Sequence, residues 1–347
     1  MKTLEQFQNH VVDVPMQISW LIGDLMEFKG KQELFTRQIP QKLQLLREHA
    51  LIESAVSSNR IEGVEVDQKR IKTLVFGQPA LHDRDEEEVA GYRSALTLIH
   101  SQGAAFPVSA ENILRIHKMI RGDIWDAGRY KDKPVDIVEI LPNGERTIRF
   151  KSVSPEETPA MLDGAVDLLD SLIKDSRIHP FILLGAFNLD FLCVHPFRDG
   201  NGRVSRLLLL LMCYHFGLEA GRYISLERII EQNKERYYET LKISSQRWHE
   251  GRHDPWPYIG YLLFILKRAY QEFEERVGQT DSPRGDKTQL IENAIKTFAA
   301  GFSVSDLQHA CPGVSMDLIR RTLKVMQELN AVKCVRKGRN AKWMRIN

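Results

Sequence analysis

The chain has 347 residues, of which 43% are hydrophobic and 27% charged, a length that suggests about two or three domains and a core that needs no disulfides. Its four cysteines (Cys193, Cys213, Cys311 and Cys334) form no CxxC pair, which argues against a zinc site and indicates free thiols in a reducing compartment. The first 17 residues have no apolar run after their single lysine, and no apolar run elsewhere approaches the roughly 20 residues that a bilayer needs. We therefore expect a cytoplasmic protein with neither a signal peptide nor a membrane segment.

The last 65 residues carry most of the positive charge. Residues 283–347 contain 12 Lys or Arg and 5 Asp or Glu, a net charge of +7, whereas the preceding 282 residues carry a net charge of −5. This contrast indicates a separate basic unit for which nucleic acid is a candidate partner. A basic surface without a ligand is the alternative, because many small domains are basic.

Taken in chain order, the pattern of apolar residues predicts helices along most of the chain. One predicted helix ends at Gly63, and another begins at Ser109 and ends at Gly122. Serine is a typical residue at the start of a helix, and glycine at its end. The predicted helices lie at 46–63, 85–100, 109–122, 181–194, 203–217 and 229–244.

Two segments interrupt the helical pattern. The stretch VDIVEILPNGERTIRF (135–150) is rich in branched residues on both sides of Pro142-Asn143-Gly144, which predicts a β-hairpin. The stretch VGQTDSPRGDK (277–287) is polar and contains Pro and Gly, so we interpret it as a domain boundary.

The stretch HPFRDGNGR (195–203) lies between the two most apolar predicted helices. The backbone N–H groups at the start of the second helix are unpaired, and the two glycines beside them would let an anion approach closely. The side chain of Asn201 adds a donor, and Arg203 and Arg206 lie on neighbouring parts of the helix surface. The pattern therefore predicts a loop that binds several phosphates.

Two further residues of this loop suggest chemistry. Asp199 alone would repel phosphate, but a carboxylate beside phosphates can hold Mg²⁺. His195 is the usual type of proton acceptor near neutral pH. Each feature by itself is more often structural, but their occurrence within twelve residues favours nucleotide transfer to a hydroxyl. The P-loop and protein-kinase patterns do not occur.

The longer stretch HPFRDGNGRVSR (195–206) resembles the HPFx[DE]GNGRxxR signature of the Fic family at every defined position. The resemblance extends from about residue 50 to about residue 250. Enzymes of this family mostly transfer AMP from ATP to a Ser, Thr or Tyr hydroxyl of a protein. The resemblance thus implies a mainly helical core with a β-hairpin flap, and an adenylyltransferase activity.

The resemblance also implies a role for each residue of the signature. His195 would accept the proton of the target hydroxyl, and Asp199 would bind the Mg²⁺ that bridges the α- and β-phosphates of ATP. Phe197 would anchor the loop in the core. The remaining positions would form the anion hole (Gly200, Asn201 and Gly202) and hold the outer phosphates (Arg203 and Arg206).

Two other regions are similar to parts of the family's active site. The hairpin at 135–150 resembles the flap, whose edge would bind an extended target segment by strand addition; this edge comprises Val135, Asp136, Ile137 and Val138. Tyr237 and Tyr238 resemble the paired tyrosines that line the adenine pocket, with ordinary helix packing as the alternative. Val138 departs from the small Gly of many relatives, and Ser245 departs from the Asn of some.

The stretch SSNRIEG (57–63) fits the pattern [ST]xxxE[GN] of the family's inhibitory helix, through Ser58, Glu62 and Gly63. Ser58 and Glu62 are four residues apart and therefore share a helix face. The position upstream of the core is that of the subclass inhibited by its own N-terminal helix. A glutamate exposed on the surface by chance is the alternative.

The basic tail resembles a winged helix-turn-helix domain. Ser303 and Asp306 form a capping pattern, Pro312-Gly313 would end that helix, and Ser315 can cap the next one. Arg320 and Arg321 lie on this second helix and would face DNA or a protein. Two β-like pieces follow around Gly338, and a buried stripe is predicted at residues 318, 319, 323, 326 and 329.

We therefore predict a mainly α protein with an N-terminal helical region (1–105, inhibitory helix at about 50–63), a Fic core (106–276), a linker (277–287) and a winged helix-turn-helix domain (288–347). Its predicted activity uses ATP and Mg²⁺ to modify a hydroxyl-bearing target protein and is restrained by Glu62; a homodimer is a candidate assembly. Two alternatives stay open. In the first, the same site removes AMP, with Glu62 activating water and His195 protonating the leaving hydroxyl. In the second, the protein is a DNA-binding regulator whose core only senses nucleotide.

Overall fold

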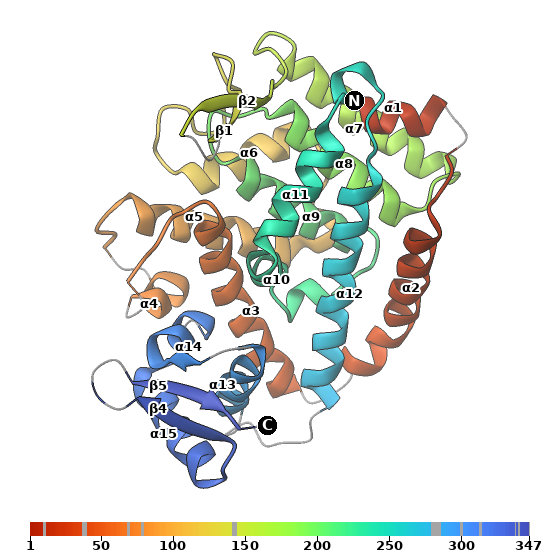
Figure 1. Ribbon diagram of the computed structural model, residues 1–347. Helices are drawn as coiled ribbons and strands as arrows, with labels where there is room; N and C mark the ends of the chain where they lie inside the picture. Colours follow the sequence, from red (N-terminus) through yellow and green to blue (C-terminus); the bar gives the residue numbers. More distant parts are fainter. Residues whose placement is uncertain are drawn as a thin grey trace.

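The computed structural model of the chain describes residues 1–9, 12–36, 40–67, 70–77, 80–140, 144–278, 286–298, 301–311, 314–336, 338 and 341–346. Within these residues the protein is mainly helical, as predicted, with two small antiparallel sheets. Figure 1 shows a large helical body and, below it, a smaller unit made of the C-terminal helices and strands. No helix in the described part of the chain is long and apolar enough to cross a membrane.

Within the described residues the helical body contains twelve α-helices, three short 3₁₀-helices (η1–η3) and the first sheet. Its elements are α1 (Lys2–Asn9), α2 (Met16–Thr36), α3 (Pro40–Ile61), α4 (Ile71–Phe76), α5 (Arg84–Gln102), η1 (Gly103–Ala105), α6 (Ala110–Arg121), β1 (Ile137–Ile140), β2 (Arg146–Phe150), α7 (Thr158–Asp175), α8 (Pro180–Val194), α9 (Asn201–His215), η2 (Ala220–Arg222), α10 (Leu226–Gln232), α11 (Lys234–Ser245), η3 (Trp248–Glu250) and α12 (Trp256–Gly278).

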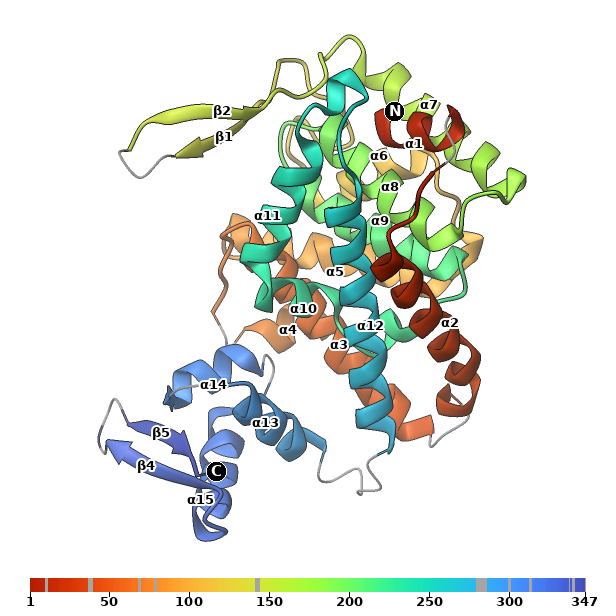
Figure 2. The ribbon, with the colours of Figure 1, turned by 45° about the vertical axis from the view of Figure 1, so that its right-hand side comes forward.

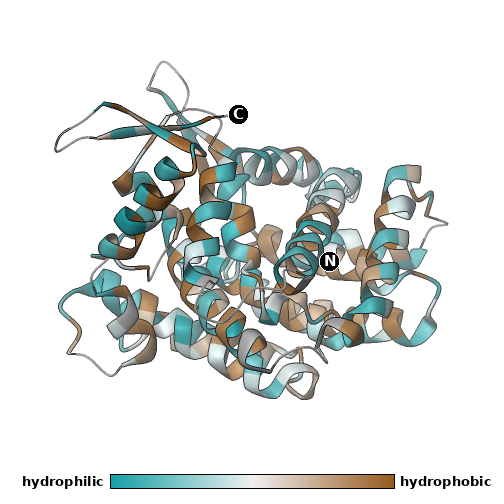
Figure 3. Ribbon diagram, turned by 90° about the horizontal axis from the view of Figure 1, so that it is seen from below, coloured by the Kyte–Doolittle hydropathy of each residue, from teal (hydrophilic) through white to brown (hydrophobic). Residues whose placement is uncertain are grey.

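One hydrophobic core joins buried residues of this body from Met1 to Val277. Helix α8 lies at its centre, with every residue from Phe181 to Val194 buried, because a helix that is apolar all round can only be accommodated in the interior. The surrounding helices carry hydrophobic and hydrophilic residues on the same helix (Figure 3). Since α8 ends just before His195 and α9 begins at Asn201, the core fixes both ends of the loop between them.

Most predicted helices are confirmed, and the capping residues explain their ends. Ser109 caps the start of α6, where its side chain accepts a hydrogen bond from the backbone N–H of Asn112 at 3.2 Å. Gly122 follows the last residue of α6 and has a φ of 65°. The single helix predicted over 229–244 is wrong, because the chain forms two helices there, α10 and α11. Asn233 separates them with a φ of −121°, and its Nδ2 donates to the carbonyl of Ile229 at 2.8 Å.

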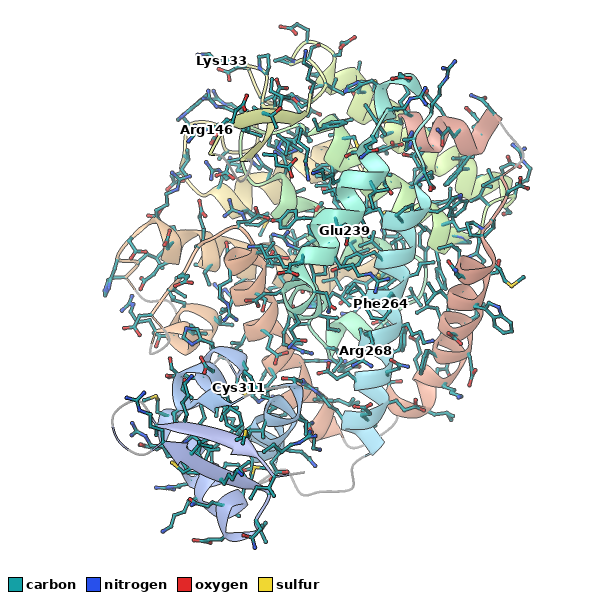
Figure 4. All side chains as sticks on the ribbon, viewed as in Figure 1. Lys133, Arg146, Glu239, Phe264, Arg268 and Cys311 are labelled. Atoms are coloured by element: carbon teal, nitrogen blue, oxygen red, sulfur yellow. The ribbon has the colours of Figure 1, made fainter. Side chains whose placement is uncertain are left out.

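The predicted hairpin is confirmed as the antiparallel pair β1 and β2, in which Val138 lies opposite Ile148. Figure 2 shows it projecting from the helical body, and Figure 4 places Arg146 at that end of the molecule. The predicted turn residues Pro142-Asn143 lie outside the described residues. The strand edge predicted from Val135 is wrong for its first two residues: β1 begins at Ile137, and Asp136 Oδ1 instead accepts a hydrogen bond from the backbone N–H of Ser152 at 3.1 Å.

The C-terminal unit has its own core, which includes Ile291, Leu307 and Leu323. Its three-stranded sheet has the order β3-β5-β4. The elements are α13 (Asp286–Thr297), β3 (Phe302–Ser303), α14 (Val304–Ala310), α15 (Met316–Glu328), β4 (Val332–Arg336) and β5 (Lys342–Arg345). The unit contacts α3 of the helical body, where Arg60 Nη1 donates to the carbonyl of His309 at 3.2 Å.

Several details of the basic tail follow the sequence. The capping pair Ser303 and Asp306 is confirmed as a reciprocal capping box, and Ser315 caps α15. The stripe predicted on α15 is wrong at Leu329, which lies beyond the last helical residue and is 73% exposed. Pro312-Gly313 and the linker residues 279–285 lie outside the described residues.

Candidate active site

His195 follows directly after α8, where its backbone N–H caps the helix by donating to the carbonyl of Phe191 at 3.0 Å. Its φ of 52° is left-handed, a conformation that costs a residue other than glycine about 1–2 kcal/mol and persists only where the surroundings impose it. Burial, followed by the positive charge of Lys131, lowers the pKa of His195 to about 4. The imidazole is therefore neutral near pH 7 and able to accept a proton.

The loop after His195 is held closed by its own side chains. Phe197 is fully buried and stacks on His117 of α6, with ring centroids 3.8 Å apart. Asn201 Oδ1 accepts from the backbone N–H of Phe197 at 2.9 Å, and its Nδ2 donates to the carbonyl of the same residue at 2.8 Å. Because both polar groups of Asn201 are used within the loop, its structural contribution is to bring the two ends of the loop together.

Two glycines lie at the start of α9, of which Gly200 is buried and Gly202 is half-buried and lines a cavity. Gly200 adopts a φ of 84° as the residue before the helix, and a Cβ at Gly202 would collide with Oε1 of Glu62. The carboxylate of Glu62 thus lies against the helix N-terminus, the place where backbone N–H groups and the helix dipole favour a negative group. A phosphate that bound there would meet Glu62.

Arg206 connects the second turn of α9 to the end of α3. Its Nε donates to Ser58 Oγ at 2.9 Å, and its Nη2 donates to the Ser58 carbonyl at 2.9 Å and to Glu62 Oε1 at 2.8 Å. Burial alone would lower the pKa of Arg206, but the negative charge of Glu62 raises it above its ordinary value. Ser58 and Glu62, which were predicted to share a helix face, therefore both accept hydrogen bonds from the guanidinium of Arg206.

A buried network of charges surrounds Asp199 and was not foreseen from the sequence. Arg203 Nη1 donates to Glu88 Oε2 at 2.5 Å and to Asn59 Oδ1 at 3.3 Å. Arg121 Nη1 donates to Glu88 Oε1 at 3.1 Å and to Asp199 Oδ2 at 2.6 Å. Burial opposes ionisation of Asp199, yet Arg203 and Arg121 hold the pKa of this carboxyl below its ordinary value.

Asp199 can contribute one ligand to a metal ion, since its side chain is 51% exposed beside the glycines. No cluster of three or more metal-binding side chains occurs among the described residues. Mg²⁺ is commonly held by one or two carboxylates together with the phosphates of a substrate, so this donor fits an ion that arrives with a nucleotide. Both carboxylate oxygens also accept hydrogen bonds from the protein, including one from the backbone N–H of Gly200 at 2.5 Å.

A cavity of about 270 Å³ opens beside these groups. Its walls include His195, Gly202 and Glu62, and residues of the hairpin close its other side. Tyr237 is buried and Tyr238 partly exposed, with ring centroids 5.1 Å apart, and both line the cavity. Other lining residues are Asp136, Ile137, Arg149, Phe150 and Ser245.

Eight of the predicted site residues do not line this cavity: Ser58, Val135, Val138, Asp199, Gly200, Asn201, Arg203 and Arg206. Of these, Val138 is 51% exposed. Arg149, which no motif indicated, enters the cavity from β2, where it follows the exposed Ile148 and precedes the buried Phe150. An arginine at alternate positions of a hairpin has no sequence signal of its own, so only the fold could place it here.

Comparisons with known proteins show what the central region is similar to. Residues 107–213 match the Fic/DOC family model. A protein adenylyltransferase Fic of Nematostella vectensis is 26% identical over 227 residues, which cover 62% of this chain and 47% of that protein. The protein adenylyltransferase fic-1 of Caenorhabditis elegans is 31% identical over 144 residues, or 40% of this chain and 26% of that protein. The chain therefore spans less than half of the length of these curated relatives.

Solved structures share the fold. A Fic family protein from Desulfovibrio desulfuricans G20 superposes with a TM-score of 0.61 and 21% identity, covering 97% of this chain and 98% of that chain. A Fic domain containing signaling protein from Bacteroides thetaiotaomicron has a TM-score of 0.61 and 22% identity over 75% of this chain. At these identities the likeness concerns the fold alone.

Proposed function

Because this chain carries a Fic domain at residues 107–213, we propose that it transfers AMP from ATP to a Ser, Thr or Tyr hydroxyl of a target protein. The observation that supports this proposal most is the content of one cavity. It brings together the neutral imidazole of His195, the glycine-lined start of α9 and the pair Tyr237 and Tyr238. In the proposed function these groups would serve as the proton acceptor, the phosphate site and the aromatic wall for the purine.

In the proposed reaction, His195 accepts the proton of the target hydroxyl as the hydroxyl oxygen attacks the α-phosphorus of ATP. The new bond joins this oxygen to AMP, and the bond between the α-phosphorus and the bridging oxygen breaks, so that pyrophosphate leaves. The backbone at Gly200 and Gly202 holds the phosphates, and Arg206 grips the outermost one. Mg²⁺ at Asp199 would neutralise phosphate charge.

The chain as described is proposed to be restrained by Glu62. This carboxylate pairs with Arg206 and lies against Gly202, so it competes with ATP both for the guanidinium and for the helix start. ATP could enter, but its α-phosphate would be out of line with the attacking hydroxyl. The supporting observation is that three hydrogen bonds of one buried arginine all go to Ser58 and Glu62.

A second candidate function is the removal of AMP from a modified protein. Glu62 and His195 line the same cavity, so the carboxylate could activate a water while the imidazole protonates the leaving hydroxyl. The two activities are separated by incubating the unaltered protein and Glu62→Gly with an AMP-modified target. If removal is the main activity, Glu62→Gly should no longer strip AMP.

The pH dependence follows from the environment of His195. Burial and the Lys131 charge lower its pKa to about 4, so the neutral base persists as pH falls to that range and is lost only below it. We therefore expect kcat/KM for transfer to stay constant between about pH 5.5 and 7.5 and to fall as pH drops toward 4. A pH series with Glu62→Gly checks this; an acid limb near 6.5 would contradict it.

The C-terminal unit is proposed to be a winged helix-turn-helix domain that binds DNA. The order helix, strand, two helices and a final hairpin supports this assignment, with α15 as the recognition helix and the β4-β5 hairpin as the wing. Arg320, Arg321 and Lys324 are exposed on α15. If the DNA-binding regulator is the main function, duplex binding should persist when AMP transfer is absent.

DNA binding should weaken steeply with salt, because phosphate contacts release counterions. Replacing both Arg320 and Arg321 by alanine in the full chain should lower the affinity further and make the salt dependence shallower by about two charges. Fluorescence anisotropy with a labelled duplex at rising salt measures both quantities. Replacing Lys2 and Lys31, on the helical body, by alanine is the matched control and should leave binding unchanged.

A further inference from the structure

Lys131 lies in the segment between α6 and β1 and is only 2% exposed. A buried lysine is rare unless its ammonium group has partners, because removing the charge from water is costly. Its Nζ donates to the carbonyl of Val194 at 2.9 Å and to Ser152 Oγ at 2.9 Å, and its backbone N–H donates to the carbonyl of Pro196 at 2.9 Å. Lys131 thus binds the residue before His195 and the residue after it.

The two carbonyls, of Val194 and Pro196, lie immediately before and after His195. That of Val194 is among the last of α8, which have no partner within the helix and carry the negative end of its dipole. An ammonium group is the natural partner of such an end. The segment between them contains His195 in its left-handed conformation, which the surrounding structure has to impose. Lys131 therefore fixes the backbone on both sides of His195: its side chain binds the carbonyl before this residue, and its backbone N–H binds the carbonyl after it.

The charge of Lys131 also reaches the imidazole. Its two Nζ acceptors are neutral oxygens, and the described residues provide no ion pair for it. Burial lowers the pKa of Lys131 to about 8, while Asp136 opposes the shift, so the group is still largely protonated at pH 7. The charged groups that act on His195 are Lys131 from this segment, Glu62 from the turn just after α3, and Arg149 from β2.

We propose that Lys131 is a positioning residue for His195, holding the backbone on both sides of the imidazole with its ammonium group and its backbone N–H. The inference rests on the proposed role of His195 as the base. It also links the base to the hairpin, because Ser152, the other partner of the ammonium group, lies two residues after the end of β2 and donates its backbone N–H to Asp136.

The test compares Lys131→Met and Lys131→Arg in the full chain carrying Glu62→Gly, so that inhibition does not mask the effect. Histidines labelled at Cε1 are titrated by NMR, and the signal of His195 is identified by its loss in His195→Ala. Lys131→Met should raise the His195 titration midpoint, because a nearby positive charge is gone, and should lower kcat about tenfold or more with KM for ATP unchanged. Lys131→Arg, which keeps the charge, should keep the midpoint of the parent.

A purely structural role would lower kcat but leave the His195 midpoint of Lys131→Met at the parent value. An unmoved midpoint or an unchanged kcat would therefore overturn the inference. If Lys131→Met does not fold, as judged by circular dichroism, Ser152→Ala replaces it. This variant removes one of the two Nζ acceptors and keeps the charge, so kcat should fall while the midpoint stays; an unchanged kcat would overturn the inference.

The titration separates this inference from the proposed function. If the parent protein transfers no AMP, the proposed function fails, yet the midpoints still show whether Lys131 controls His195. If the parent transfers AMP and the midpoint of Lys131→Met does not move, the inference fails alone.

Discussion

Replacing His195 by alanine is expected to lower AMP transfer by about 10² to 10⁴-fold while ATP still binds. In the proposed reaction the imidazole would act on the proton of the target hydroxyl, whereas the phosphates would contact the start of α9 and the guanidinium of Arg206. Loss of the base therefore removes an interaction of the transition state and leaves ground-state binding in place. The measurement combines transfer of radiolabelled AMP with calorimetric titration of ATP, both in the Glu62→Gly background.

The matched control is His215→Ala. His215 is an exposed histidine at the far end of the same helix, α9, where its Nε2 lies 2.8 Å from the carbonyl of Phe106. Its removal should leave transfer unchanged. Transfer by His195→Ala within about threefold of the parent would refute the assignment of the base.

Replacing Glu62 by glycine is expected to raise AMP transfer by about 10²-fold, the cost of roughly 1 Å of misplacement at the reacting atoms. The carboxylate pairs with Arg206 at 2.8 Å and lies against Gly202. Its removal frees the guanidinium for the outermost phosphate and clears the helix start, so ATP can bind with its α-phosphate in line. Neither His195 nor Asp199 is altered by this substitution.

The double variant Glu62→Gly, Arg206→Ala should lose the gain, because the freed guanidinium is then absent. Glu65→Gly removes the same charge three residues further on, outside the contact with Arg206, and should behave like the unaltered protein. Incorporation of radiolabelled AMP at saturating ATP compares the four proteins. Equal incorporation by the unaltered protein and Glu62→Gly would refute inhibition by α3.

The sequence predicted those parts of the site that are close together in the chain. The stretch from His195 to Arg206 is one apolar helix end, a glycine loop and one helix start, and its local geometry follows from the residue types. The Ser58-Glu62 pair was predicted to share a face because four residues make about one helical turn. Its contact with Arg206 joins segments more than 140 residues apart, and only the family resemblance suggested it.

The residues that the sequence did not reveal act across long separations. Glu88 from α5 and Arg121 from α6 meet Arg203 and Asp199 in the core, and Lys131 reaches the end of α8. A single glutamate, arginine or lysine has no pattern that distinguishes it from a surface charge. These residues could be recognised only once helix packing had buried them beside the loop.

For two residues of the motif, the side chains bind other parts of the protein instead of pointing to a phosphate site. Asn201 was predicted as a side-chain donor to phosphate, but both of its polar groups already bind Phe197. Arg203 was predicted to hold phosphates, yet it pairs with Glu88 and Asp199 and is 1% exposed. In this arrangement both side chains stabilise the loop. Arg206 is also buried, at 3% exposure, and would become available to a nucleotide only when Glu62 releases it.

Intact-mass spectrometry of Glu62→Gly after incubation with ATP and Mg²⁺, alone and with a cell lysate, tests the proposed transfer most directly. The account predicts a covalent AMP adduct on a hydroxyl residue of the protein itself or of a lysate protein. It also predicts that the adduct is absent when His195→Ala is added to Glu62→Gly. No adduct with either protein, or an equal adduct with both, would contradict the account.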